Sequence, residues 1–210
     1  MVRSWIADVT PLYDEECYRR YYEELPDFRK KKADALRSMK MKAQSVGVWS
    51  LWGKIRAEYN LPEFSAFNLS HSGTWVMCAA SMDAGAHDVR VGCDMEKTAQ
   101  MRKGVAERFF CAEECSVIFS GRTQEERDDC FFRYWVLKES FMKATGKGMA
   151  LPMNSFCIRL GEPPVLVRQP GEFPEKYYYR EYEKEGLPYK MAVCSTDEEI
   201  DTEIHMELRL

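Results

Sequence analysis

Two carboxylates stand two residues apart in the segment VGCDME, residues 91–96. The segment alternates like a β-strand, so the side chains of Asp94 and Glu96 are expected on one face. Neighbouring carboxylates repel each other unless a cation lies between them, and Mg²⁺ takes one or two protein carboxylates together with phosphate oxygens. The pair predicts a metal site, although acidic pairs on an exposed strand face are also common.

A second candidate lies in WVLKESFMKATGKG, residues 135–148, where Glu139 and Lys143 are four residues apart. On a helix this spacing places both side chains on one face, where an ordinary surface ion pair is one interpretation. The surrounding helix is strongly apolar, which favours a position beside a cleft. There Glu139 could be a third metal ligand or a general base, and Lys143 could bind phosphate.

The third candidate is FNLSHSG, residues 67–73, in which His71 stands between Ser70 and Ser72. A histidine in a small-residue turn after a strand can reach a phosphate, but a lone histidine is more often structural. A serine hydrolase is not favoured, because both serines flank the histidine and the sequence has no G-x-S-x-G elbow.

The charge balance limits how such sites could hold an anion. The 210-residue chain has a net charge of -4, which disfavours general attraction to nucleic acid or to an anionic membrane. A phosphate must therefore be held by local positive charge. One basic run could be a phosphate clamp or a solvated helix face, and it contains Arg29, Lys30, Lys31, Lys32, Arg37, Lys40 and Lys42.

Neither a membrane anchor nor a disulfide framework is expected. The longest apolar stretch runs only from Trp75 to Ala80, whereas a membrane-spanning helix needs about 20 apolar residues. The acidic start of the chain argues against a secretory signal, and we expect a cytoplasmic protein. The eight cysteines include no CxxC pair, and Cys111 and Cys115 lack the partners of a zinc site, so we expect free thiols.

The elements that must position these residues mix helices and strands without regular alternation. Helices are expected over residues 14–22, 27–52 (as one or two helices), 103–110, 112–119 and 130–145. Strands are expected over residues 4–10, 66–69, 75–81, 88–95, 155–160, 165–169, 176–183 and 189–195, with a turn at 70–73 and a loop at 83–88. This order predicts an α+β fold.

Together and in this order, the three segments resemble the 4'-phosphopantetheinyl transferase superfamily, and within it the large single-chain type that activates surfactin synthetase. The combination of G-x-D-x-E with W-x-x-K-E-S-x-x-K-x-x-G-x-G at this separation is the most specific part of the resemblance. The matching stretches span nearly the whole chain: DALRSM, FNLSHSGTWV, VGCDMEK, ERFFCAEE, residues 135–160 and YKMAVCS.

The resemblance implies two similar α/β halves related by a pseudo-twofold axis, with the active site in the cleft between them. The N-terminal half would cover residues 1–88 and the C-terminal half residues 89–210. Asp94, Glu96 and Glu139 would bind Mg²⁺, and Glu139 and Lys143 would be the catalytic residues. Contacts with coenzyme A are implied for Arg37, Ser38, Ser70, His71, Lys138 and Lys143.

The implied reaction transfers 4'-phosphopantetheine from coenzyme A to a serine hydroxyl of an apo acyl or peptidyl carrier protein and releases 3',5'-ADP. The enzyme would serve fatty-acid or secondary-metabolite synthesis as a monomer, with neither nucleic acid nor membrane as partner. The alternatives are a Mg²⁺-dependent hydrolase of coenzyme A or nucleotides and a non-catalytic module that binds coenzyme A or a carrier.

Two regions lie outside these motif matches. At the adenine end the chain departs from the family, because RAEYNLPEF, residues 56–64, lacks the usual Y-G-K-P. For carrier docking, the likeness suggests the region after Glu114, including Val117, Ile118 and Phe119.

Overall fold

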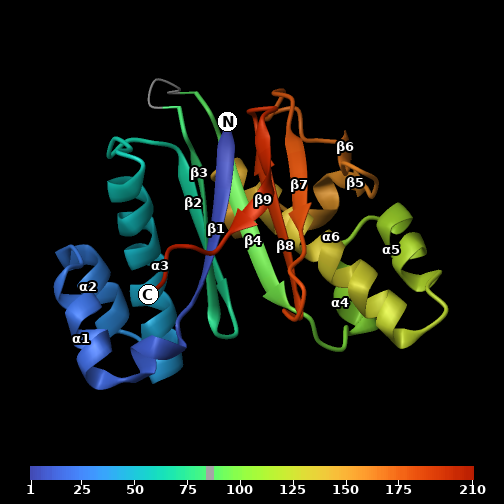
Figure 1. The fold of residues 1–210 in the computed structure, drawn as a ribbon. Coiled ribbons are helices and arrows are strands. Elements are labelled where there is room, and N and C mark those ends of the chain that lie inside the picture. The colour runs from blue at the N-terminus through green and yellow to red at the C-terminus, as the bar shows by residue number, and fades with distance from the viewer. Residues whose placement is uncertain (84–87) are drawn as a thin grey trace.

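Two β-sheets stand side by side in the centre of the computed structural model, which describes residues 1–83 and 88–210 (Figure 1). The first sheet has, in spatial order, β2 (Phe67–Ser72), β3 (Trp75–Ser81), β1 (Val2–Asp8) and β9 (Ile200–His205). The second has β4 (Val91–Lys97), β8 (Tyr189–Ser195) and β7 (Tyr178–Tyr182). A separate hairpin pairs β5 (Cys157–Arg159) with β6 (Val165–Arg168).

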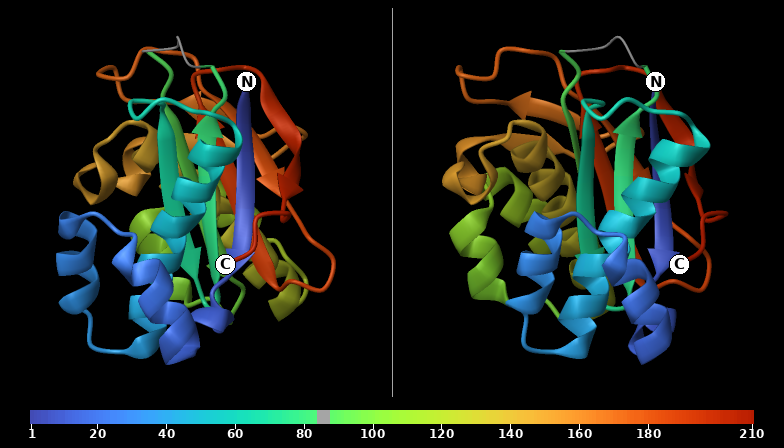
Figure 2. Two further views of the ribbon diagram at one scale, coloured as in Figure 1. Left: turned by 60° about the vertical axis from the view of Figure 1, so that its left-hand side comes forward. Right: turned by 90° about the vertical axis from the view of Figure 1, so that its left-hand side faces the viewer.

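Helices cover the outer face of each sheet (Figures 1 and 2). The first group is α1 (Glu15–Glu23), α2 (Asp27–Asp34) and α3 (Met39–Glu58), and the second is α4 (Lys103–Phe109), α5 (Ala112–Phe119) and α6 (Gln124–Ala144). Short 3-10 turns occupy Thr10–Tyr13, Gly148–Ala150 and Met153–Ser155. No helix of the described residues is long and apolar enough to cross a membrane. The predicted mixed α+β class is confirmed.

Strand alternation divides the core into layers. β1 turns Trp5 and Ala7 toward the first group of helices, whereas Val2 and Ile6 pack in the layer between the two sheets. β8 divides its apolar residues in the same way, because Met191 and Val193 belong to the layer between the sheets while Ala192 and Cys194 pack toward the second group of helices. Both sheets are therefore buried on two faces.

Gly92 in β4 lies directly beneath α6. A Cβ at this position would come within 2.0 Å of the Ser140 carbonyl oxygen and within 2.4 Å of the Ala144 nitrogen. Both are backbone atoms of α6, so only glycine allows the helix to approach the strand this closely. The close packing fixes the distance between the side chains of α6 and those of β4.

Several local predictions are confirmed. Asp14 caps α1, since its carboxylate accepts a hydrogen bond from the Cys17 N–H at 2.9 Å. The region expected as one or two helices forms α2 and α3, and Ser38 caps α3 by accepting from the Met41 N–H at 3.3 Å. The expected loop at 83–88 lies mostly outside the described residues.

Two boundaries differ from the predictions. The turn predicted at 70–73 is wrong for Ser70, His71 and Ser72, because β2 continues through Ser72 and the chain turns at Gly73, whose φ is 60°. The long helix begins at Gln124 rather than at residue 130. Its polar first turn is held by a capping box, in which Thr123 and Glu126 each bond to the other's backbone N–H.

The last strand was not expected from the sequence. β9 pairs in parallel with β1, and the segment after it stays on the first sheet, where the Trp5 indole N–H donates to Glu207 Oε1 at 3.1 Å. The first sheet therefore includes a strand from the end of the described chain. The division of the protein at residue 88 stays a prediction.

The expectation of free thiols throughout is wrong for one pair. Cys111 and Cys157 form a disulfide across a sequence separation of 46 residues, while Cys17, Cys78, Cys93, Cys115, Cys130 and Cys194 are free. Cys111 directly precedes α5 and Cys157 begins β5. The packing of these two elements brings the sulfurs together, which spacing along the sequence does not reveal.

Candidate functional site

The edges of the two sheets meet where β2 runs beside β4. Three side chains at alternating positions of β2 face β4 and accept hydrogen bonds from its backbone N–H groups. The pairs are Cys93 with Asn68 at 3.1 Å, Met95 with Ser70 at 3.3 Å and Lys97 with Ser72 at 3.0 Å. We call this contact the β2–β4 seam, and four of the candidate residues lie on its two strands: Ser70, His71, Asp94 and Glu96.

Each serine of the seam also holds one carboxylate of β4. The Ser70 hydroxyl donates to Asp94 Oδ1 at 2.8 Å, and the Ser72 hydroxyl donates to Glu96 Oε2 at 2.8 Å. Ser70 and Asp94 are buried, whereas Glu96 is half-buried. Asp94 and Glu96 therefore share one face of the strand, as predicted, and the serines fix their orientation.

Lys143 reaches this carboxylate pair from α6. Its Nζ donates to Asp94 Oδ1 at 2.7 Å, to the Cys93 carbonyl oxygen at 3.0 Å and to the Ser70 hydroxyl at 3.2 Å. Burial alone would lower the pKa of Lys143, but the charge of Asp94 outweighs it and the pKa is raised above its ordinary value. The lysine is held charged against one of the predicted metal ligands.

Glu139 lies one helical turn before Lys143 and is half-buried. Burial and then the charge of Asp94 raise its pKa, against the opposite effect of Lys143. Burial and the charge of Asp94 likewise raise the pKa of Glu96 to about 6, with Glu139 adding to the shift. The charge of Asp94 therefore raises the pKa values of both glutamates, and the charge of Lys143 opposes both shifts.

The donor set fits a small divalent cation in character. Asp94 Oδ2 is buried and has no hydrogen-bond partner among the described residues, which is costly for a carboxylate oxygen. However, the carboxylate oxygens of Asp94, Glu96 and Glu139 do not all lie within 4.8 Å of one another, a distance that within residues 1–83 and 88–210 is met only by Cys111, Glu113 and Cys157. Binding a cation here requires the carboxylates to turn inward.

His71 lies on β2 next to these residues but its side chain is exposed, because the alternation of the strand directs it away from Ser70 and Ser72. Partial desolvation, and then the positive charges of Lys143 and Lys32, lower its pKa. The charge of Lys32 therefore acts at the position of His71. Lys32 belongs to the basic run in the sequence, but nothing in its spacing marked it out from the neighbouring lysines.

The other basic residues behave differently. Arg29 is structural, because its guanidinium donates to the Ser45 carbonyl oxygen at 2.9 Å and lies 4.8 Å from the Trp49 ring centroid. Arg37 and Ser38 lie exposed between α2 and α3. Among the contacts of the described residues, neither joins the β2–β4 seam.

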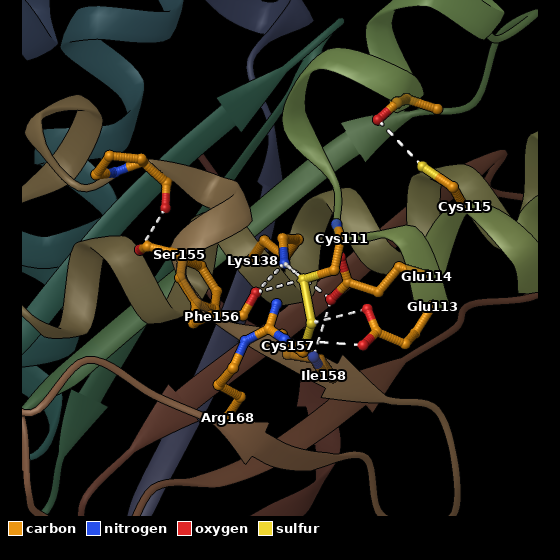
Figure 3. Close-up of polar contacts among 12 residues, drawn as sticks. Cys111, Glu113, Glu114, Cys115, Lys138, Ser155, Phe156, Cys157, Ile158 and Arg168 are labelled. Carbon is orange, nitrogen blue, oxygen red and sulfur yellow. Dashed lines mark hydrogen bonds and ion pairs between the residues drawn. A yellow bond between two sulfur atoms is a disulfide. The ribbon is translucent and has the colours of Figure 1, made fainter.

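Lys138 does not reach the seam. Its side chain is 0% exposed, and its Nζ donates to Glu114 Oε1 and to the Phe156 carbonyl oxygen, each at 2.8 Å (Figure 3). Burial lowers its pKa to about 8, against the effect of Glu114. Successive residues of a helix point in different directions, so Lys138 is directed into the core while Glu139 is not. The structure does not support the expected contact of Lys138 with coenzyme A.

A separate cavity of about 710 Å³ lies between the start of α6 and β7. Two of the three cations that line it are already paired, since Arg133 makes two hydrogen bonds with Glu181 at 2.9 and 2.8 Å and Lys190 pairs with Asp129. None of the candidate residues lines this cavity. The seam remains the better candidate site.

Known proteins match the chain over the region that carries these residues. Residues 90–194 match the model of the 4'-phosphopantetheinyl transferase superfamily. The chain is 39% identical over 140 residues to the 4'-phosphopantetheinyl transferase ffp of Bacillus subtilis, which covers 67% of this chain and 59% of that protein. It is 35% identical over 147 residues to the 4'-phosphopantetheinyl transferase Sfp of Bacillus subtilis, which covers 70% of this chain and 62% of that protein.

The chain thus spans about three fifths of the length of these two relatives. Among solved structures, it is similar to the holo-[acyl-carrier-protein] synthase of Thermotoga maritima, with 18% identity, a TM-score of 0.41 and coverage of 50% of this chain and 61% of that chain. The family match includes the strand with Asp94 and Glu96 and the helix with Glu139 and Lys143. On this match, the chain belongs to the 4'-phosphopantetheinyl transferase superfamily.

Proposed function

We propose that the protein transfers 4'-phosphopantetheine from coenzyme A to a serine hydroxyl of an apo acyl or peptidyl carrier protein, with release of 3',5'-ADP. One observation carries the proposal: β4 and α6 bring Asp94, Glu96, Glu139 and Lys143 together at the β2–β4 seam, beside His71. Three acids with one lysine suit a reaction in which charge is neutralised on phosphate oxygens.

Asp94, Glu96 and Glu139 would hold Mg²⁺ at this seam. The Oδ2 atom of Asp94, which has no partner among the described residues, and the raised pKa values of Glu96 and Glu139 support a bound cation, because burial and the charge of Asp94 disfavour ionised glutamates that a cation would stabilise. When bound, Mg²⁺ supplies neutralisation and polarisation of pyrophosphate oxygens. Ser70 and Ser72 keep two of the ligands oriented.

Glu139 is the proposed base. It accepts the proton of the carrier serine, whose oxygen then forms a bond to the β-phosphorus of coenzyme A while the bond from that phosphorus to 3',5'-ADP breaks. A raised pKa brings a carboxylate closer to the value that suits proton transfer near neutral pH. Lys143 would turn from Asp94 toward the phosphates and offset charge on the departing group.

The binding of the coenzyme is assigned to fewer residues than the sequence suggested. His71 and Lys32 are the proposed partners of a terminal phosphate, on the basis of their shared electrostatics. Ser70 is assigned to the carboxylates, because its hydroxyl is already used by Asp94, Met95 and Lys143. Arg37 and Ser38 remain proposed contacts near the nucleotide. Lys138 is left out of the site.

The proposed cleft lies between two similar halves, residues 1–88 and 89–210, related by a pseudo-twofold axis. In support, one long helix packs on each sheet, α3 on the first and α6 on the second. In that division, β9 belongs to the second half of the sequence but joins the sheet of the first half. For carrier docking, Val117 is 45% exposed whereas Ile118 is 0% exposed, so we retain Val117 and exclude Ile118 from the proposed surface.

The test is a loading assay with the purified protein, coenzyme A, Mg²⁺ and a panel of apo carriers, followed by intact mass. We expect at least one carrier to gain 4'-phosphopantetheine. Glu139→Gln should reduce the rate by about 100-fold or more, as loss of a general base does. Glu125→Gln, at an exposed position of the same helix, is the matched control and should load at the wild-type rate.

The same assay separates the alternatives. A hydrolase would release 3',5'-ADP from coenzyme A without any carrier. A binding module would bind coenzyme A and leave it uncleaved. Absence of mass gain across the whole panel would count against the transferase. A wild-type rate in Glu139→Gln would remove Glu139 from the mechanism while leaving the transferase in place.

A further inference from the structure

A group of reactive side chains separate from the β2–β4 seam lies between α5, α6 and β5. It is formed around Cys111 and Cys157. Their Cα atoms are 6.2 Å apart, within the normal range for a disulfide, and the sulfurs are bonded. Both residues are buried, but the neighbouring side chains of Glu113 and Arg168 are 71% and 52% exposed (Figure 3). The pair therefore lies just beneath the surface, apart from the β2–β4 seam.

The surroundings of the two sulfurs differ in charge. Cys111 Sγ is 3.9 Å from the Lys138 ammonium, and Cys111 stands at the N-terminus of the eight-residue helix α5. Both favour a thiolate at Cys111, although Glu114 beside Lys138 offsets part of that charge. Cys157 Sγ is 3.7 Å from Glu113 Oε2, and this carboxylate favours the protonated thiol at Cys157.

None of the other cysteines in the described part of the chain combines a cationic neighbour with a bonded second sulfur, although Cys17 Sγ lies 3.9 Å from the Arg20 guanidinium. Burial raises the pKa of five of them, which are Cys78, Cys93, Cys115, Cys130 and Cys194. A thiol with a raised pKa reacts slowly with oxidants, because the thiolate is the nucleophile. Oxidation is therefore directed to the pair that combines a cationic neighbour with a second sulfur in bonding distance.

A metal ion is the rival occupant of the same residues. Ligand atoms of Cys111, Glu113 and Cys157 lie within 4.8 Å of one another, and two thiolates with a carboxylate would suit Zn²⁺. Two cations oppose this, since Lys138 lies 3.9 Å from Cys111 Sγ and Arg168 Nη1 lies 3.7 Å from Glu113 Oε1. Positive neighbours disfavour a metal cation and favour a reactive thiolate.

We propose that Cys111 and Cys157 form a reversible oxidation site for small peroxides, in which Cys111 is the attacking thiol and Cys157 the resolving thiol. The Cys111 thiolate attacks one oxygen of hydrogen peroxide, so that an S–O bond forms, the O–O bond breaks and hydroxide leaves as water after protonation. The Cys157 sulfur then attacks the Cys111 sulfur and displaces a second water. Two thiols are oxidised, one peroxide is reduced, and a thiol reductant reverses the change.

The first experiment uses the full chain. The protein is reduced with a phosphine, desalted, treated with hydrogen peroxide and mapped by differential alkylation and peptide mass. We expect the Cys111–Cys157 peptide to be the main cross-link, and its thiols to return on reduction. In the reduced protein, iodoacetamide should modify Cys111 before Cys157, which tests the order of reactivity without any substitution.

The second experiment separates the two roles. In Cys157→Ser the sulfenic acid of Cys111 cannot be resolved, so dimedone should label Cys111 after peroxide treatment. In Cys111→Ser, labelling of Cys157 should be about tenfold weaker, as expected for a thiol that lies beside the Glu113 carboxylate. Cys115→Ser, on the same helix, is the matched control and should leave the cross-link unchanged. Circular dichroism checks that each variant is folded.

Three results would overturn the proposal. The first is a reduced protein in which peroxide forms no Cys111–Cys157 bond. The second is faster alkylation or dimedone labelling at Cys157 than at Cys111. The third is one zinc ion per chain after purification, with both thiols protected until a chelator is added, which would identify the group as a metal site.

Discussion

Glu96 is held in an environment that disfavours its charge. Its pKa is raised from 4.5 to about 6, first by burial and then by Asp94. Ionisation of Glu96 therefore destabilises the folded state. This destabilisation is absent at pH values below 4.5, the ordinary pKa, and complete at pH values above the folded-state pKa of about 6. A carboxylate kept at such a cost is expected where a cation offsets it.

The first prediction follows from the destabilising effect of Glu96 ionisation. Without Mg²⁺, Glu96→Gln should raise the free energy of unfolding by up to about 2 kcal/mol at about pH 7.5 and change it little at about pH 4. Urea denaturation at both pH values measures the difference. Added Mg²⁺ should stabilise the wild type and leave the variant unchanged, and the variant should not load carriers. A destabilised variant at the higher pH would contradict the assigned environment of Glu96.

Ser70 is expected to contribute both to the stability of the fold and to the orientation of the proposed metal ligand Asp94. Ser70→Ala removes the acceptor of the Met95 N–H and the donor to Asp94, which should cost about 1–3 kcal/mol of stability. It should also raise the Mg²⁺ concentration for half-maximal loading by about 10- to 100-fold, because ligand orientation is lost. Ser155→Ala, at an exposed serine, is the control. An unchanged Mg²⁺ requirement in Ser70→Ala would assign the hydroxyl to another role.

At the residue scale, the sequence indicated which residue types could form the site, but for residues on a helix it did not show in which direction each side chain points. Asp94 and Glu96 could be placed on one face because a strand alternates strictly. Lys138 and Glu139 could not be separated in the same way, since both stand in one apolar helix and only the packing decides which of them enters the core. The Glu114 carboxylate that receives Lys138 lies 24 residues away in the sequence.

At the scale of elements, the contact of α6 with β4 determines the geometry of the site. Gly92→Ala would place a methyl group against two backbone atoms of α6, so the helix must move away from the strand. We expect a loss of about 1–3 kcal/mol in stability, typical of overpacking, and a fall in loading because Asp94 and Lys143 separate. Thermal or urea unfolding, together with the loading assay, tests this.

Gly104 is the matched control for Gly92. It lies in α4, and an added Cβ would meet no atom of the described residues within 4 Å apart from its chain neighbours and the backbone of its own helix. Gly104→Ala should therefore stabilise the protein by about 0.5–1 kcal/mol, as expected in a helix, and load normally. Equal effects of the two substitutions would show that close packing at Gly92 is not required.

Helices and strands with strong apolar patterns were predictable, and their less apolar ends were not. The Ser70-His71-Ser72 segment has the composition of a turn, but its hydrogen bonds to β4 extend the strand. The first turn of α6 is polar and is stabilised by its own cap. β9 is rich in acids and alternates weakly, so only its pairing with β1 makes it a strand.

At the scale of the whole molecule, the Cys111–Cys157 bond should add stability by restricting the unfolded chain. A cross-link that spans 46 residues is expected to contribute about 4 kcal/mol on the chain-entropy account. Urea unfolding of the oxidised and reduced protein measures this difference. The double variant Cys111→Ser, Cys157→Ser should be insensitive to reductant. A wild type that reductant does not destabilise would contradict the prediction.

The position of β1 between β3 and β9 has a consequence for synthesis on the ribosome. β1 and β3 are made early and can pair at once, but the other edge of β1 stays uncovered until residues 200–205 have left the exit tunnel. An uncovered strand edge is a site of wrong pairing between nascent chains. We therefore expect yield in cells to depend on translation speed and chaperone supply more than on the stability of the finished protein.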